Sequence, residues 1–119
     1  MPVRGIRRRY LRFRVDTKLE LTDNDVYEAI RNSIKELYGL KGLAKADPTL
    51  IEYDSNNRKG ILRCNNDELR TTRAALAYIT NIKGVEAALH ISRVSGTIKS
   101  LKRKEVSKKP ESELHEKVN

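Results

Sequence analysis

Residues 9–15 read Arg-Tyr-Leu-Arg-Phe-Arg-Val, and this stretch decides the fold. Every second residue from Leu11 to Val15 is apolar, and the residues between them are arginines. A two-residue period of this kind is typical of a β-strand that buries one face. We therefore predict a strand over Tyr10–Val15 with one face in the core and the other face cationic.

The residues that follow predict a helix. Thr22 and Asp25 have the spacing of a capping box, and apolar residues then recur at helical intervals as far as Tyr38. Gly39 is a natural left-handed stop for this helix. Leu40–Ala46 can add a short helical turn beyond it.

Two extended runs and a second helix come next. The runs at Thr49–Tyr53 and Gly60–Asn65 are joined by a polar turn, which indicates a hairpin. Asn66 can cap a helix whose apolar stripe continues to Ile82, and Gly84 lies just past its end.

A last extended run, Val85–Val94, completes the order strand, helix, strand, strand, helix, strand. This is the split βαβ order of ferredoxin-like and RNA-recognition-like folds, so we predict an α+β sandwich. Its four-stranded antiparallel sheet has both helices on one face and leaves the other face free. The first and third strands are central, which places Arg12 and Arg14 beside Arg63.

The chain divides into three parts. Residues 1–9 form a basic N-terminal arm, and residues 10–104 form a single domain that ends in a short C-terminal helix. Residues 105–119 are polar and poor in hydrophobic side chains, so we expect that tail to be disordered.

The composition excludes several classes of protein. The 119 residues include one cysteine and two histidines, too few for a disulfide framework or a four-ligand zinc site. No stretch approaches the roughly 20 apolar residues that a membrane span needs. We expect a soluble, cytoplasmic protein that binds no membrane, metal or cofactor.

The net charge of +9 is concentrated at two places. Residues 1–14 hold six arginines and no acid, and residues 99–109 hold six basic residues against one acid. Residues 15–98 carry twelve basic and twelve acidic side chains, so the body is neutral. Two concentrated basic runs suit a polyanion, and nucleic acid is favoured over a membrane surface.

Arginine is suited to phosphate because it forms bidentate hydrogen bonds and releases condensed counterions, with little sequence preference. Base stacking is poorly supported, since Ile61 and Arg63 stand where RNA-recognition strands carry aromatic residues. The predicted RNA-binding residues are Arg4, Arg7, Arg8, Arg9, Arg12, Arg14, Arg63, Lys99, Lys102, Arg103 and Lys104.

No set of side chains predicts a catalytic or metal site. The tight acidic groupings are Asp23 with Asp25 and Asp67 with Glu68. Both groupings fall at expected helix starts, where carboxylates complement the helix dipole and need no further role. We expect the isolated chain to be non-catalytic.

Several segments, in order and at family-like spacing, resemble the archaeal and eukaryotic ribonuclease P protein family called component 2 in archaea. The resemblance covers about Arg8 to Lys104. The segments that carry it are Arg9-Tyr10-Leu11-Arg12-Phe13-Arg14-Val15, Gly60-Ile61-Leu62-Arg63-Cys64, Arg73-Ala74-Ala75-Leu76 and Val94-Ser95-Gly96-Thr97-Ile98-Lys99-Ser100.

The resemblance implies a non-catalytic protein subunit of ribonuclease P, which removes the 5′ leader from precursor tRNA. In that family the RNA and its Mg²⁺ perform the hydrolysis, and the protein supports the catalytic RNA. The family also implies a protein partner, ribonuclease P protein component 3, in a two-plus-two heterotetramer. The residues compatible with such an interface are Ile61, Arg70, Ala74 and Ala77.

Charge and fold alone leave other functions open. A ribosome-associated protein, or another structured-RNA-binding module of the same fold, would show the same basic flanks. A protein-protein adaptor is also possible if the flanks are incidental.

Overall fold

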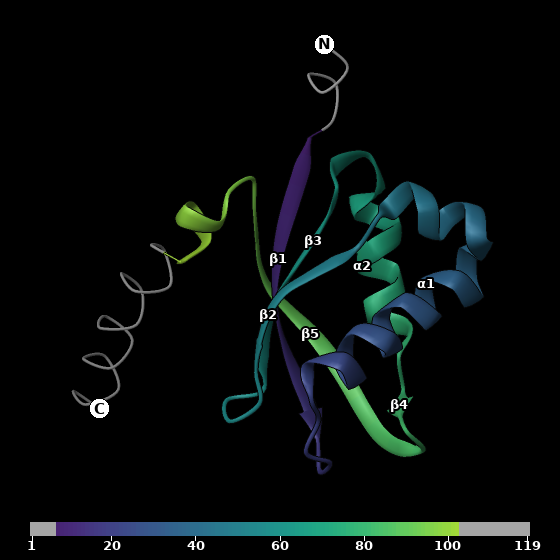
Figure 1. The fold of residues 1–119 in the computed structure, drawn as a ribbon, viewed down its shortest axis with the longest axis vertical. Coiled ribbons are helices and arrows are strands. Elements are labelled where there is room, and N and C mark those ends of the chain that lie inside the picture. Colours follow the sequence, from purple (N-terminus) through teal and green to yellow (C-terminus); the bar gives the residue numbers. More distant parts are fainter. Residues whose placement is uncertain (1–6, 103–119) are drawn as a thin grey trace, which may run out of the picture.

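The computed structural model describes residues 7–102. Figure 1 shows a strongly twisted antiparallel sheet with two helices packed on one side. The elements are β1 (Arg8–Thr17), α1 (Asp23–Ala46), β2 (Thr49–Asp54), β3 (Lys59–Asn65), the 3-10 turn η2 (Asn66–Glu68), α2 (Leu69–Tyr78), β4 (Asn81–Ile82) and β5 (Val85–Ser95). The predicted α+β class is confirmed, with β1 between β3 and β5 as expected.

The sheet has five strands in the order β2-β3-β1-β5-β4, whereas the sequence predicted four. The additional strand arises because α2 ends at Tyr78, before the end of its expected apolar stripe. Ile82 is instead buried in β4 and pairs with Val85. Between them Lys83 and Gly84 both have positive φ, 55° and 79°, which is the geometry of a two-residue hairpin turn.

The capping box of α1 is confirmed. Thr22 Oγ1 accepts a hydrogen bond of 3.1 Å from the backbone N–H of Asp25, and Asp25 Oδ2 accepts one of 3.0 Å from that of Thr22. Gly39 has a φ of 77° and breaks the regular helix, but the chain resumes helical geometry and continues to Ala46. The second helix has no matching cap, because Asn66 begins η2 and makes no side-chain cap bond.

The core lies between the sheet and the two helices. Phe13 and Val15 of β1 are 0% and 1% exposed, and they pack with the apolar stripes of α1 and α2. Gly60 of β3 lies opposite Phe13, and a Cβ there would lie 2.7 Å from Cζ of Phe13. The rings of Phe13 and Tyr53 stack with centroids 6.4 Å apart, so two aromatic side chains fill the space that the glycine leaves.

The other face of the sheet was expected to be free, but part of it is covered. Residues 98–102 form a short helix, as predicted, and Figure 1 shows it on the side of the sheet away from α1 and α2. Leu101 in that helix is 0% exposed, and Ile61 on β3 is 2% exposed. Lys102 Nζ lies 3.2 Å from Oε1 of Glu52, the residue that pairs with Ile61 across β2 and β3. The short helix is therefore held against the β2–β3 half of this face, where Ile61 is buried.

Candidate nucleic-acid interface

The face of β1 opposite the main core is cationic, because its side chains alternate with the buried ones. These side chains are Arg8, Tyr10, Arg12 and Arg14. The antiparallel register aligns the last three with residues on both neighbouring strands. The rows across β3, β1 and β5 are Arg63–Tyr10–Ser95, Ile61–Arg12–Arg93 and Lys59–Arg14–His90. We call these three rows the open face.

Arg63 lies on this face beside the arginines of β1, as the sequence predicted. It is directly opposite Tyr10 and diagonal to Arg12. Its side chain is held loosely, since the one hydrogen bond within residues 7–102 is a 3.5 Å contact from Nη2 to Oγ1 of Thr49. The Nε atom of Arg63 is buried and has no hydrogen-bond partner among the described residues.

Arg93 is a cationic residue of the open face that the sequence interpretation missed. Strict alternation from Leu89 would have turned Arg93 toward the core. The β1–β5 register shifts between Arg12 and Phe13, leaving Ser92 as an extra residue in β5. This β-bulge changes the phase of the strand and aligns Arg93 directly with Arg12. A period-2 pattern gives no signal for such a shift.

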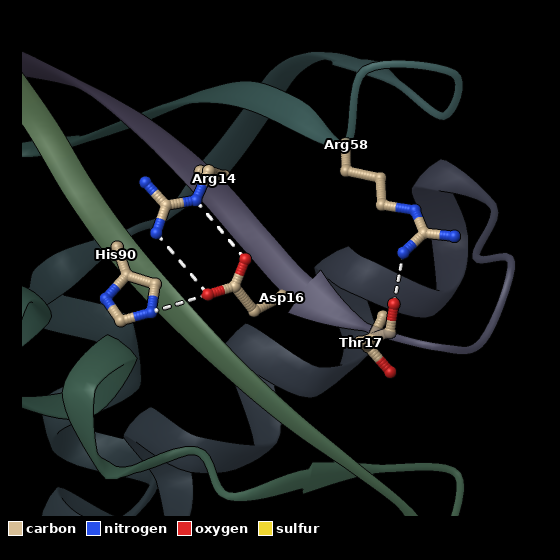
Figure 2. Close-up of polar contacts among 5 residues, drawn as sticks. All are labelled: Arg14, Asp16, Thr17, Arg58 and His90. Atoms are coloured by element: carbon tan, nitrogen blue, oxygen red, sulfur yellow. Dashed lines mark hydrogen bonds and ion pairs between the residues drawn. The ribbon is translucent and has the colours of Figure 1, made fainter.

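One end of the open face carries its own acidic partner. Figure 2 shows Arg14 from β1 and His90 from β5 both reaching the carboxylate of Asp16. Arg14 Nε donates to Asp16 Oδ1 over 3.3 Å, and Nε2 of His90 lies 3.1 Å from Oδ2. The hydrogen bond from Arg14 is the main reason that the pKa of Asp16 lies below its ordinary value. Asp16 thus orients Arg14 and offsets part of its charge.

The N-terminal arginines do not form a single patch. Arg8 and Arg9 were expected in the basic N-terminal arm, but both belong to β1. Arg8 Nη1 donates to Asn65 Oδ1 over 2.7 Å, while Arg9 shares the core face with Leu11 and its Nε donates to Asn66 Oδ1 over 2.8 Å. Asn66, which did not cap α2, therefore anchors Arg9.

The remaining predicted RNA-binding residues are placed in different ways. Arg7 and Lys99 are exposed, and Lys102 is exposed but forms the ion pair with Glu52. Arg4, Arg103, Lys104 and the tail over 105–119 lie outside the described residues. Arg58, drawn in Figure 2, donates to the backbone carbonyl of Thr17 and so braces the β2–β3 turn against the end of β1.

The residues considered for a protein interface divide between the two sides of the sheet. Arg70, Ala74 and Ala77 are exposed on α2, which ends at Tyr78, a residue that is 49% exposed. Ile61 is 2% exposed on the other side of the sheet, so it is not available to an exposed interface. The α2 surface is the part of the predicted interface that a partner could reach.

One member of each acidic grouping has a structural role. Asp25 completes the cap of α1, and Glu68 Oε1 accepts a hydrogen bond of 3.0 Å from Thr71 Oγ1. Within residues 7–102 no three His, Cys, Asp or Glu side chains gather as metal ligands. Cys64 is buried, and burial is the main cause of its raised pKa. No helix in the same range is long and apolar enough to cross a membrane.

Comparison with known proteins gives consistent matches. Residues 9–106 match the model of the Rpp14/Pop5 family. Ribonuclease P protein component 2 of Pyrococcus furiosus is 36% identical over 101 residues, covering 85% of this chain and 84% of the relative. The component 2 protein of Methanosarcina mazei is 31% identical over 99 residues, covering 83% and 84%.

A solved structure shows the same fold. A chain in the cryo-EM structure of yeast ribonuclease MRP superposes with a TM-score of 0.65 at 13% identity, covering 92% of this chain and 95% of that one. The match over most of the chain, together with relatives above 30% identity, shows that this chain belongs to the Rpp14/Pop5 family of ribonuclease P protein subunits.

Proposed function

We propose that the chain is a non-catalytic subunit of ribonuclease P that binds the catalytic RNA and supports removal of the 5′ leader from precursor tRNA. The observation that carries this proposal is the open face, where Arg63, Arg12 and Arg93 come together from three adjacent strands. Family membership supports the ribonucleoprotein role. Asp25 caps α1 and Glu68 accepts from Thr71, so one member of each acidic grouping already has a local structural role. Hydrolysis is assigned to the RNA in this proposal.

The mechanism is electrostatic. Folded RNA brings phosphates close together, and fixed guanidinium groups lower the repulsion between them. Arginine suits this role better than lysine because its planar fork can hold two phosphate oxygens at once. Mg²⁺ held by the RNA would supply the hydrolytic chemistry, and the protein would reduce how much Mg²⁺ the folded RNA requires.

A protein partner is also part of the proposal. Ribonuclease P protein component 3 would bind this chain in a two-plus-two heterotetramer, with Arg70, Ala74 and Ala77 of α2 at the interface. Those residues lie across the sheet from the open face, so protein and RNA could be bound at the same time.

The test is cleavage of precursor tRNA by the cognate ribonuclease P RNA and the other protein subunits, with and without this chain, across a Mg²⁺ titration. We expect omission of the chain to raise the Mg²⁺ concentration needed for half-maximal cleavage. Exchanging Arg7 and Lys99 for glutamine should shift it in the same direction, since both are exposed basic residues. The matched control is a double exchange of Lys35 and Lys41, which are exposed on α1.

Equal cleavage with and without the chain at every Mg²⁺ concentration would contradict the proposal. Binding to ribosomal RNA with equal or higher affinity would favour the ribosome-associated alternative. Binding to component 3 without any affinity for RNA would favour an adaptor.

A further inference from the structure

Arg93 stands out among the cations of the open face because nothing in the described part of the chain offsets its charge. It forms no ion pair and no hydrogen bond with any residue in 7–102. Arg14 and Lys102 differ in this respect, since each has a carboxylate within 3.3 Å. Arg93 is half-buried and lies directly across the ladder from Arg12.

A half-buried guanidinium with no carboxylate partner among residues 7–102 is costly, because part of its hydration is lost and no opposite charge compensates for it. An anion that accepts hydrogen bonds from Arg93 would offset that cost.

The backbone is shaped to hold Arg93 on this face. The bulge at Ser92 reverses the side on which the next residue lies, and Ser92 Oγ donates to the carbonyl oxygen of Arg12 over 3.3 Å. Bulges that turn a side chain toward a site are common beside functional surfaces. Without this bulge Arg93 would lie among the apolar residues on the other face.

We infer that Arg93, which lies diagonal to Tyr10 across the β1–β5 ladder, binds a backbone phosphate of an RNA strand that lies along the β1–β5 half of the sheet. Tyr10 lies between Arg63 and Ser95 and offers an aromatic ring against which a base or ribose can pack. This inference rests on the proposed function and names the residues through which the sheet takes part in it.

The covering helix limits the path of the RNA. Residues 98–102 close the β2–β3 half, where Leu101 is 0% and Ile61 2% exposed. An RNA strand on this face is therefore confined to the rows of Tyr10, Arg12 and Arg14 and their partners on β5. This differs from binding across the full width of an uncovered sheet.

The test compares Arg93→Gln with Arg73→Gln in the full chain, using the cognate ribonuclease P RNA as the probe. Arg73 is exposed on α2, on the opposite side of the sheet, so its exchange removes the same charge from the wrong face. We expect Arg93→Gln to weaken binding about tenfold and to lower the log-log salt slope by about 0.7 to 0.9, the value for one phosphate contact. Arg73→Gln should change binding less than twofold.

Thermal melting without RNA accompanies each variant. The Arg93→Gln chain should melt no lower than the wild type, because the lost side chain makes no contact that stabilises residues 7–102. Ultraviolet crosslinking of the wild-type complex gives a readout that needs no variant. Crosslinks to RNA are expected at Tyr10 and not at Tyr78, which is exposed on α2.

The outcomes separate this inference from the proposed function. If the wild type binds the RNA while the variants at Arg93 and Arg73 are indistinguishable and Tyr10 is not crosslinked, the inference is wrong and the proposed function stands. If the wild type fails to bind the RNA, the proposed function is wrong as well. A large loss confined to Arg93→Gln, with unchanged melting, supports both.

Discussion

The two faces of the sheet use the same strand for opposite purposes. On the helix side β1 contributes Phe13 and Val15, which are buried against α1 and α2. On the other side the residues between them are arginines that meet further arginines on β3 and β5. The alternation of a strand lets one short segment build the core and carry the cationic surface.

The faces differ in charge and in how well their polar groups are satisfied. On the helix side Ser33 is buried, and its Oγ donates to the carbonyl of Ala75 over 2.6 Å. A groove of about 950 Å³ on that side is lined by Glu28 and Glu36 among others. On the open face, Arg63 and Arg93 have no carboxylate partner among residues 7–102. The helix side is packed around a satisfied buried hydroxyl and the open face presents cations, so changes on each should affect different measurements.

The largest effect on stability is expected at the core. Phe13→Ala removes a fully buried ring and its stacking with Tyr53, which should lower the free energy of unfolding by about 3–5 kcal/mol. Urea denaturation measures this change. Arg93→Gln on the opposite face should change it by less than about 0.5 kcal/mol. Similar losses of unfolding free energy for Phe13→Ala and Arg93→Gln would contradict the division of roles between the two faces.

An intermediate effect is expected where the open face has its own apolar contact. Leu101→Ala should lower the free energy of unfolding by about 2 kcal/mol, because Leu101 is fully buried in the short helix that the Lys102–Glu52 ion pair holds against β2. Leu40→Ala is the matched control, since Leu40 is 72% exposed and should lose almost nothing. Equal stability of the two variants would show that the helix at 98–102 does not cover the sheet in solution.

A smaller effect is expected at the start of α1. Thr22→Ala removes the acceptor for the Asp25 N–H and should cost about 1 kcal/mol of unfolding free energy. Asn24→Ala, an exposed exchange in the same turn, should cost less. Neither variant should change the RNA affinity, because both lie on the helix side. A changed RNA affinity of the Thr22→Ala variant would contradict the separation of the two faces.

The smallest effect concerns pH. The hydrogen bond from the Thr22 backbone, and then Lys83 at 3.2 Å, hold the pKa of Asp25 below its ordinary value of 3.8. A carboxylate with a lowered folded-state pKa stabilises the fold above its unfolded pKa, and this contribution is lost as the pH falls through the folded value. The melting temperature of the wild type should therefore fall more steeply below pH 3.8 than that of Asp25→Asn. If the melting temperatures of the wild type and Asp25→Asn fell in parallel with pH, the acid sensitivity would arise from other carboxylates.

Much of the fold follows from local patterns in the sequence. The alternation of β1, the capping box at Thr22 and the break at Gly39 are each fixed by residues near in sequence, and the structure confirms them. The turn of β4 was missed because Lys83 is not one of the residues that usually adopt positive φ there. Ile79 and Ile82 were therefore read as one helical stripe with α2.

The candidate site was less predictable because it depends on register. The sequence placed Arg12, Arg14 and Arg63 together, since pairing of the two central strands follows from the fold class. It did not show that the helix at 98–102 lies against the β2–β3 half, because the Lys102–Glu52 contact that holds it there joins residues 50 positions apart without any periodic signal. Arg93 was missed for the same kind of reason, since a bulge is set by pairing with β1.

The bulge at Ser92 determines which side chains at the end of β5 lie on each face of the sheet. Two residues of β5 with an even number of residues between them lie on opposite faces of a regular strand. They lie on the same face when the bulge is between them, as His90 and Arg93 do. If Ser92 paired with Arg12 in a regular ladder, Arg93 would lie opposite Leu11 and would exchange surroundings with Val94, with no change in composition. Deleting Ser92 would instead leave Arg93 opposite Arg12. Two chains with identical arginines in this strand can therefore present different surfaces if only one of them accommodates the extra residue as a bulge.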